Sequence, residues 1–269
     1  MSTSEKIELF RKLHHGPRIL VLANASDAAA ARIVEQTGFP ALATSSAGVA
    51  FSLGYPDGER IPPVEMLAAV GRIVRAVSIP VSADVESGYG DPVATARALV
   101  DAGAVGMNLE DVIHAGPAAL VDMDAQVRII EKIRSASELV INARTDIYLK
   151  SVGDPSTRFE RTVERCNAYL KAGADCAFVP GVRDAETIAK LTQAIEGPVN
   201  ILGTGGVPPI AELERLGVAR VSVGSGPMRA AMGLIQRIAK ELYEQGTYTA
   251  MLEGAMSSGD ANALFGPCG

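Results

Sequence analysis

The sequence of 269 residues has little of several residue types that mark particular classes of protein. It contains no tryptophan, only 4% aromatic residues, and three cysteines, Cys166, Cys176 and Cys268. The cysteines have neither the spacing of a zinc site nor that of a disulfide framework, which is typical of a reducing cytoplasm. We expect Cys166 and Cys176 to be buried structural thiols in a helix and a strand, and Cys268 to be a tail residue.

Blocks of basic charge and long apolar runs are also missing. The chain has 25 basic and 31 acidic residues, a net charge of −6, which argues against nucleic acid or an anionic membrane as a partner. No apolar run reaches the roughly 18 residues that a membrane-spanning helix needs. Residues 4–14 alternate charged and apolar positions as an amphipathic helix does, and they do not resemble a secretion signal. We therefore expect a cytoplasmic protein with small-molecule partners.

The sequence does contain a regular alternation of short apolar segments and segments with helical periodicity. The expected strands are 19–23, 41–44, 79–81, 104–109, 139–143, 176–179, 199–202 and 220–223. Each is followed by an expected helix, and the helices are 28–38, 62–77, 92–102, 124–134, 156–172, 184–195, 209–216 and 227–243, with a loop at 45–58 before the second. This order predicts an α/β fold, a (β/α)₈ TIM barrel forming one domain over residues 1–269. An open doubly wound sheet is the alternative, but no G-x-G-x-x-G follows the first strand.

Residues 245–269 remain after the eighth predicted helix. They contain an apolar patch with helical spacing around Met251 and Leu252, followed by a stretch rich in glycine, serine and asparagine. We expect an extra C-terminal helical segment that packs on a partner or is swapped with it, in a homodimer or homotetramer. A frayed tail is the alternative.

Polar residues gather where the predicted strands end, which in a barrel of this kind is where catalytic groups lie. These residues are Asn24, Ser45, Ser46, Asp84, Glu86, Glu110, Asp111, Arg144, Asp146, Asn200 and Ser225, with Asp57 in the loop after the second strand. Carboxylates packed on one rim raise one another's pKa, so a divalent cation is expected among them. Oxygen ligands favour Mg²⁺, or Mn²⁺, over zinc.

Arg144 lies opposite the acids in this arrangement. We expect its guanidinium group to bind an anionic substrate through two parallel hydrogen bonds. The alternative is that Arg144 only neutralises Asp146 or Glu110. His114 is the one titratable group of the predicted lid, residues 112–122, that works as an acid or base near neutral pH. The alternative is an exposed loop histidine without a role.

Three motifs carry a resemblance to a known family. Residues 82–90 read SADVESGYG, residues 108–111 read NLED, and residues 143–146 read ARTD. Together with the loop 44–57, they resemble the isocitrate lyase/phosphoenolpyruvate mutase superfamily, in order, from about residue 24 to residue 226. The resemblance implies a Mg²⁺-dependent enzyme that acts on a 2-oxo acid, a related carboxylate or a phosphonate through an enolate-like intermediate.

The resemblance also implies roles for individual residues. Asp84 would bind the metal directly, and Asp57, Glu86 and Glu110 would hold its water ligands. The expected substrate-binding residues are Ser45, Ser46, Ala47, Asp84, Arg144 and Asn200. The expected catalytic residues are Arg144, Glu110 and His114.

Departures from the family pattern indicate the subclass. Members that cleave isocitrate or methylisocitrate carry a cysteine in a Lys/Arg-Cys-Gly-His motif after the fourth strand, whereas residues 110–117 here contain none. The lysine, threonine and asparagine of the phosphonate-processing lid are absent too. Gly181 takes the place of a glutamate found in many methylisocitrate lyases. We therefore expect an oxaloacetate decarboxylase-like or methylisocitrate lyase-like C–C lyase.

Three other functions remain as alternatives. The first is a P–C bond enzyme that resembles phosphoenolpyruvate phosphonomutase, carboxyphosphonoenolpyruvate phosphonomutase or phosphonopyruvate hydrolase. The second is a metal-independent barrel that binds a phosphorylated metabolite, because residues 203–206 and 224–226 are glycine-rich where barrels often bind phosphate. The third is a non-catalytic binder of 2-oxo acids.

Overall fold

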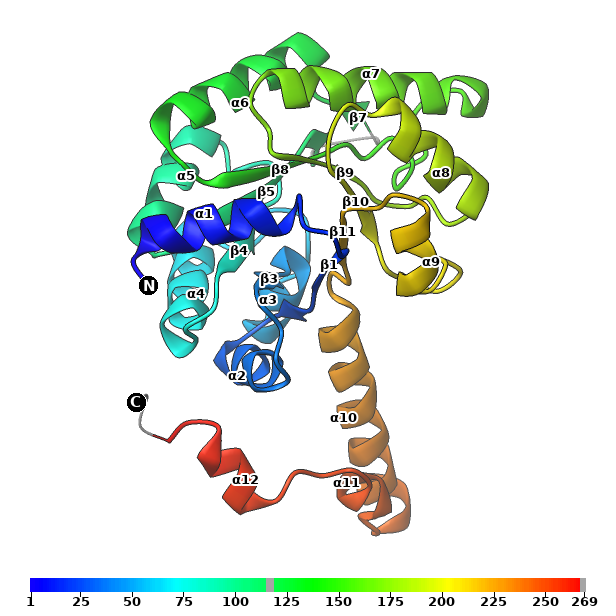
Figure 1. Cartoon of the computed structure of the whole chain (residues 1–269). Coiled ribbons are helices and arrows are strands. Elements are labelled where there is room, and N and C mark those ends of the chain that lie inside the picture. The colour runs from blue at the N-terminus through cyan, green and yellow to red at the C-terminus, as the bar shows by residue number, and fades with distance from the viewer. Residues whose placement is uncertain (115–118, 267–269) are drawn as a thin grey trace.

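The computed structural model describes residues 1–114 and 119–266, and its central feature is a closed parallel sheet (Figure 1). The strands are β1 (Leu20–Leu22), β2 (Asn24–Ala25), β3 (Leu42–Thr44), β4 (Val81–Asp84), β5 (Gly106–Glu110), β8 (Val140–Arg144), β9 (Cys176–Val179), β10 (Val199–Leu202) and β11 (Arg220–Ser222). β1 pairs with β11 and β2 with β3, and only Ala23 separates β1 from β2. The sheet therefore closes, and the predicted (β/α)₈ barrel is confirmed.

Helices surround the barrel, and many begin at an aspartate that the sequence places just before an apolar segment. Those outside the sheet are α2 (Ala28–Gln36), α4 (Pro63–Ala76), α5 (Pro92–Asp101), α6 (Met123–Ala136), α7 (Arg158–Lys171), α8 (Ala185–Ala194) and α9 (Ile210–Arg215), with a short 3₁₀ turn, η1 (Pro155–Thr157), before α7. Asp27, Asp91, Asp122 and Asp184 each accept a hydrogen bond from the backbone N–H three residues later. Such caps satisfy backbone donors that a helix leaves unpaired at its start.

The first helix, α1 (Thr3–Leu13), closes the amino-terminal end of the barrel. Phe10 of α1 is completely buried and packs with Leu20, Ala41, Val105 and Val140, which lie at or just before the beginnings of strands. The opposite end, where the strands finish, remains open for a site.

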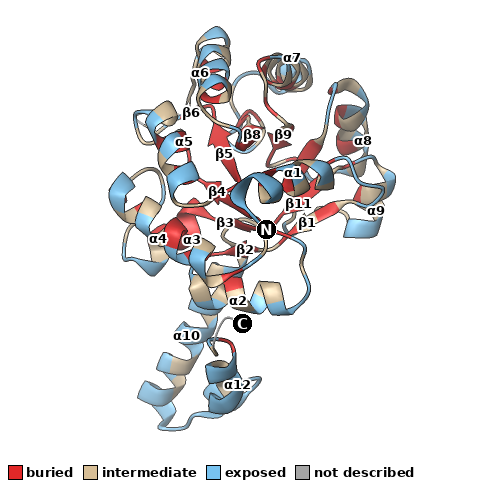
Figure 2. Cartoon of the chain, turned by 60° about the vertical axis from the view of Figure 1, so that its left-hand side comes forward, coloured by how far each residue is buried: buried red, intermediate tan, exposed pale blue. Residues whose placement is uncertain are grey.

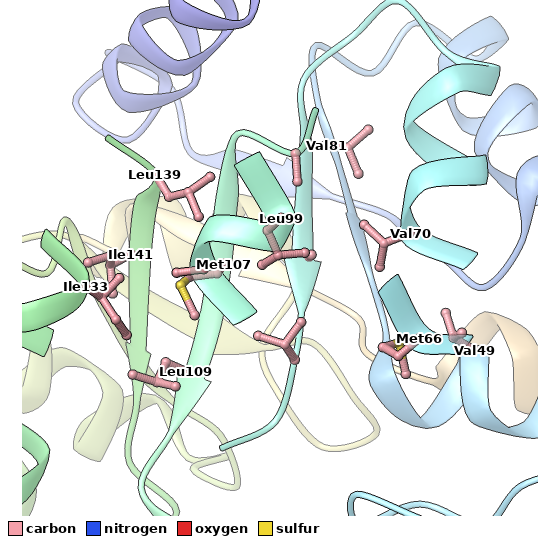
Figure 3. Packing of buried hydrophobic residues seen from close by; sticks show 14 of the residues in the cluster. Val49, Met66, Val70, Val81, Leu99, Met107, Leu109, Ile133, Leu139 and Ile141 are labelled. Atoms are coloured by element: carbon pink, nitrogen blue, oxygen red, sulfur yellow. The ribbon is translucent and has the colours of Figure 1, made fainter. Parts of the chain in front are cut away.

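Side chains alternate between the two faces of the barrel wall. Met107 and Leu109 of β5 and Ile141 of β8 point outward into an apolar layer beneath α5 and α6 (Figure 3). Asn108, between Met107 and Leu109, accepts a hydrogen bond inside the barrel from Asn142, which follows Ile141. The apolar layer stabilises the fold, and the interior is left to polar groups.

One predicted loop is wrong, because part of it is a helix. Residues 45–48 were expected to be irregular, yet α3 (Ser46–Ser52) begins there, capped by the Ser45 hydroxyl, which accepts from the Gly48 N–H at 3.2 Å. The small residues suggested a loop, but the serine cap and the buried Val49 and Ala50 favour a short helix against the core.

The C-terminal helices project from the barrel (Figures 1 and 2). α10 (Gly226–Gln245) has no buried residue, and α11 (Thr249–Leu252) and α12 (Ser258–Ala263) follow it. Leu264 returns to the barrel, where its carbonyl oxygen accepts from Arg32 Nε of α2 at 2.6 Å. A C-terminal helical segment is thus confirmed, and its exchange between subunits remains a prediction. None of the described helices combines the length and the hydropathy needed to cross a bilayer.

Cys166 and Cys176 are buried and unbridged within the described residues, as expected. Burial raises the pKa of both thiols, that of Cys176 to about 12, which suppresses their reactivity. Cys268 lies outside the described residues.

Candidate active site

A cavity of about 520 Å³ lies at the carboxyl ends of the strands. Nearly all the residues predicted for the site line it: Ser45, Ser46, Ala47, Asp57, Asp84, Glu86, Glu110, His114 and Arg144. Asn200 is the exception, because it is completely buried and its amide nitrogen lies 3.3 Å from the hydroxyl of Ser222, which lines the cavity in its place. The structure thus brings together the acids, the arginine and the histidine from the ends of several strands and the loops that follow them.

Asp84, the last residue of β4, has one oxygen bonded and one oxygen free of protein partners. Its Oδ2 accepts from the Ser46 backbone N–H at 3.0 Å and from the Ser46 hydroxyl at 2.8 Å. Its Oδ1 is buried and has no hydrogen-bond partner among the described residues. A buried carboxylate oxygen without a donor is costly, so a cation at Oδ1 would satisfy it.

Glu86, Glu110 and His114 form a group beside Asp84 that has the geometry of a metal site. One potential ligand atom from each lies within 4.8 Å of the others. His114 Nε2 is 2.9 Å from Glu110 Oε1 and 3.6 Å from Glu86 Oε2. The two glutamates are buried, with exposed fractions of 3% and 4%. The oxygen donors fit a hard divalent cation such as Mg²⁺ or Mn²⁺.

Burial and like charge shape the electrostatics of this group. Burial, together with Glu110, Asp84 and Asp57, raises the pKa of Glu86 to about 8. Burial also raises the pKa of Glu110, although Arg144 opposes the shift. Interaction with Glu110 raises the pKa of His114 despite its partial burial. The protein alone therefore does not neutralise these acids fully, and the site favours positive charge.

Glu59, which was not predicted as a site residue, joins the loop between α3 and α4 to the loop after β4. Its backbone N–H donates to Glu86 Oε2 at 2.8 Å, and its carboxylate accepts from the Ser87 hydroxyl at 2.7 Å and the Tyr89 N–H at 2.8 Å. Glu59, Glu86 and Tyr89 have φ angles of 55°, 52° and 53°, a region that non-glycine residues rarely adopt. Strain of this kind is typical of functional sites.

Arg144 is fixed by two acids. Its Nη1 lies 2.6 Å from Glu110 Oε2, and its Nε and Nη2 donate to the two oxygens of Asp146 at 2.5 and 2.8 Å. Asp111 supports this arrangement from below, because its Oδ1 accepts from the Asp146 N–H at 3.0 Å. Burial lowers the pKa of Arg144, but Glu110 and Asp146 outweigh burial and raise it. Arg144 therefore makes the neutralising contacts with Glu110 and Asp146 that were the alternative to substrate binding. Binding of substrate by Arg144 remains a prediction.

The predicted lid is described only in part. Val112–Ile113 (β6) and Ala119–Leu120 (β7) form a small antiparallel ladder, and residues 115–118 between them lie outside the described residues. His114 points from this lid to the glutamates.

Several other residues that line the cavity were not predicted from the sequence. Arg60 and Lys150 bring positive charge to the cavity, and Asn108, Leu149 and Phe178 complete parts of its wall. Nothing in the local sequence separates Arg60 or Lys150 from ordinary exposed charges. Asn108 stands two residues before Glu110 on the same strand, so its inward direction was available from the alternation of β5.

Parallel barrels carry their functional sites at the end where these groups meet, which places the chain among parallel α/β barrels that have an acid cluster suited to a metal. A family model described as phosphoenolpyruvate phosphomutase matches residues 10–243. The chain belongs to this family, within the phosphoenolpyruvate mutase/isocitrate lyase superfamily. The resemblance seen in the three sequence motifs is therefore confirmed.

Individual relatives agree with this assignment. An uncharacterized protein of Mycobacterium tuberculosis is 37% identical over 226 residues, which cover 83% of this chain and 84% of the relative. A 2-methylisocitrate lyase of Halalkalibacterium halodurans is 28% identical over 268 residues, covering 94% and 87%. The crystal structure of a provisionally named lyase/mutase of Burkholderia cenocepacia has a TM-score of 0.91 and 38% identity, covering 99% and 97%.

Proposed function

We propose that this protein is a Mg²⁺-dependent lyase that cleaves a C–C bond in a 2-oxo acid or a related small carboxylate, such as an oxaloacetate- or malate-like acid. The observation that carries the proposal is Asp84 Oδ1, which has no hydrogen-bond partner among the described residues and lies beside the buried Glu86 and Glu110. The relative named 2-methylisocitrate lyase supports C–C chemistry.

Asp84 would hold the metal directly, and Asp57, Glu86 and Glu110 would hold its water ligands. Glu86 and Glu110 are rigidly placed, whereas Asp57 is exposed at the rim. Mn²⁺ would serve as well. Bound Mg²⁺ would polarise the oxo group and stabilise negative charge on the enolate oxygen. Nitrogen is a poor ligand for Mg²⁺, so His114 is assigned to the proton and not to the metal.

The substrate would lie between this metal site and Arg144. Of the five N–H groups of a guanidinium, three are used by Glu110 and Asp146, so two remain for a substrate carboxylate. Ser45 and the Ala47 amide would bind the oxo or carboxylate oxygens. The Ser46 amide is already donated to Asp84, so its role is to orient that carboxylate.

His114 would handle the proton of the reaction. It lies between two glutamates that favour its charged form and faces the cavity from the lid. In an oxaloacetate-like acid, the C–C bond would break with loss of CO₂ and its electron pair would remain in the enolate of the product. His114 would give its proton to the enolate carbon and would regain a proton from water.

Calorimetric titration with oxalate, a mimic of the enolate of a 2-oxo acid, tests the proposal. Binding that requires Mg²⁺ supports it, and binding that ignores Mg²⁺ contradicts it. Oxaloacetate, methylisocitrate and phosphonopyruvate should then be screened for release of pyruvate. Release from phosphonopyruvate alone would select the P–C alternative, and metal-dependent binding without any turnover would select a non-catalytic binder.

We also propose that the C-terminal helices join copies of this chain into a homodimer or homotetramer. α10 exposes large apolar side chains, including Ile235 at 63% and Tyr243 at 93%. A monomeric protein rarely exposes such a group of large apolar side chains on one helix to water.

A further inference from the structure

A charged residue that forms no ion pair with the described residues lies inside the barrel, beneath the cavity. Arg220, the first residue of β11, is completely buried. Its Nη1 lies 3.3 Å from His14 Nε2, and its Nη2 donates to Asn108 Oδ1 at 3.3 Å. Within the described residues no carboxylate lies at ion-pair distance, and its Nε has no hydrogen-bond partner. Burying a guanidinium in this way is costly, which indicates that the position serves a function.

The surroundings of Arg220 leave its charge intact. His14 Nδ1 bonds to the Phe10 carbonyl oxygen at 2.8 Å, so Nδ1 carries the proton and Nε2 accepts from Arg220. The Phe10 ring faces the guanidinium at 5.8 Å. Burial lowers the pKa of Arg220 to about 10, which leaves the group charged at neutral pH. A fixed positive charge therefore stands under the site.

Arg220 determines which way the Asn108 amide points. A guanidinium group only donates hydrogen bonds, so the Asn108 atom that faces it must be the oxygen. Asn142 Nδ2 donates to the same oxygen at 2.7 Å. Asn108 Oδ1 is thus held by two donors, and its Nδ2 is turned away from them. This nitrogen makes no hydrogen bond to the described residues, and Asn108 lines the cavity.

The position of this amide matches the expected location of the substrate. Asn108 is the direct neighbour of Asp84 in the register of β4 and β5. A substrate oxygen bound to a metal at Asp84 would therefore be within reach of the Asn108 amide. The charge of Arg220 also polarises that amide, which strengthens its N–H groups as donors to an anion.

We propose that Asn108 is a substrate-binding residue that donates from Nδ2 to an anionic oxygen of the substrate, and that Arg220 is the residue that positions it. This inference rests on the proposed function, because it names a further contact in the same site. The oxygen that accepts this hydrogen bond is a carboxylate or enolate oxygen of a 2-oxo acid. Hydrogen bonds to charged groups are the stronger kind.

Two variants of Asn108 test the donor. Asn108→Asp keeps the shape and the oxygen facing Arg220, and gains an ion pair with it, so folding is preserved. It replaces the donor with a negatively charged acceptor. Asn108→Ala removes the donor without adding charge. In calorimetry with Mg²⁺, we expect oxalate affinity to fall about tenfold in Asn108→Ala and further in Asn108→Asp. Mg²⁺ affinity in the absence of oxalate should not fall in either variant.

Arg220 is tested by a double-mutant cycle. Arg220→Met should weaken oxalate binding several-fold in the native background and cause no further loss in the Asn108→Ala background. Arg220→Lys keeps a buried donor and should retain most of the affinity for oxalate. This result would show that the fold tolerates a substitution at position 220. Additive losses in the cycle would contradict the positioning role.

The outcomes separate this inference from the proposed function. If the unmodified protein does not bind oxalate with Mg²⁺, the proposed function fails and this inference fails with it. If the unmodified protein binds oxalate and both Asn108 variants bind it equally well, only the inference on Asn108 and Arg220 is overturned.

Discussion

Gly181 packs directly against the backbone of Leu149, and a Cβ atom on Gly181 would lie 2.6 Å from the Leu149 nitrogen. With a φ of 94°, the position also requires a conformation that glycine adopts most easily. A glutamate at this position, as in many methylisocitrate lyases, would collide with the segment after β8. That segment instead brings Leu149 and Lys150 to the cavity wall. Close packing at Gly181 therefore goes together with the placement of Leu149 and Lys150 in the cavity wall.

Gly181→Ala should destabilise the fold more than a glycine-to-alanine change that has room for the methyl group. Gly38 is the matched control, because its φ is 96° and nothing lies within 4 Å of an added Cβ. We expect Gly38→Ala to lower the free energy of unfolding by about 1 kcal/mol, and Gly181→Ala to lower it by about 3 kcal/mol. Urea denaturation measures both, and equal losses would contradict the close packing at Leu149.

Asp84→Ala should abolish Mg²⁺ binding and activity together, because it removes the carboxylate assigned to direct coordination. Asp57→Ala is the comparison, since that exposed carboxylate is assigned to a water ligand and should cost only several-fold in Mg²⁺ affinity. Calorimetry with Mg²⁺ alone measures both. Unchanged Mg²⁺ affinity in Asp84→Ala would refute the ligand assignment.

Arg144→Lys should weaken oxalate binding far more than Mg²⁺ binding. The lysine keeps one positive charge near Glu110 but loses the planar pair of donors that a carboxylate matches. We expect oxalate affinity to fall at least about tenfold and Mg²⁺ affinity to change less than about threefold. The two titrations on one sample give the ratio. A parallel loss of both would show that Arg144 acts only by neutralising the acids.

The stability of the metal-free protein should fall as the pH rises from about 4.5 to about 8. The folded-state pKa of Glu86 is raised to about 8 from an ordinary 4.5, so the folded protein holds the proton more tightly than the unfolded chain does. Protonated Glu86 therefore stabilises the fold at low pH, and this contribution is lost as the carboxyl group ionises. Thermal melting between pH 5 and 8, with Glu86→Gln as reference, isolates the effect.

Mg²⁺ should reverse this trend, because the cation favours the ionised carboxylates. The increase in melting temperature caused by Mg²⁺ should grow with pH over the same range. A gap between the native protein and Glu86→Gln that does not change with pH would contradict the buried, charged environment of Glu86.

Ile235→Glu should leave the protein monomeric if α10 forms the proposed interface between copies of the chain. Ile235 is one of the exposed large apolar residues of α10, and a charge at this position would have to be desolvated in an interface. Arg237→Glu is the control, because residue 237 is exposed on the opposite side of the same helix. Light scattering after size exclusion should give the 28.0 kDa of one chain for Ile235→Glu and a multiple of it for the control. Equal masses would contradict an interface on that face.

Sequence patterns predicted the barrel well because each strand and helix follows local rules. Short apolar runs, aspartate caps and glycines after helices mark the elements, and parallel closure then brings Asp84, Glu86, Glu110 and Arg144 to one end. The acids could be foreseen as a group for this reason. α3 was missed because glycine and serine suggested a loop, although Ser45 was a sufficient cap.

The remaining parts of the site depend on partners that are distant in the sequence. Glu59 is identified only by its bonds to the next loop, and Arg220 only by its burial and by an Nε that has no hydrogen-bond partner among the described residues. Asn200 has the right residue type, yet it is the second residue of β10 and is buried beside Ser222 of the neighbouring strand. Such relationships follow from side-chain packing, which no spacing rule describes.

Helix α1, which closes the amino-terminal end of the barrel, is connected to the cavity at the other end by a chain of side-chain contacts. Phe10 and His14 contact the Arg220 guanidinium, which donates to Asn108, so a change at the base of the barrel would reach the cavity through these side chains. Deleting residues 1–14 would open that base to water and loosen the amide above it. The beginning of this chain is consequently a poor place to shorten, even though it lies at the far end of the barrel from the reaction.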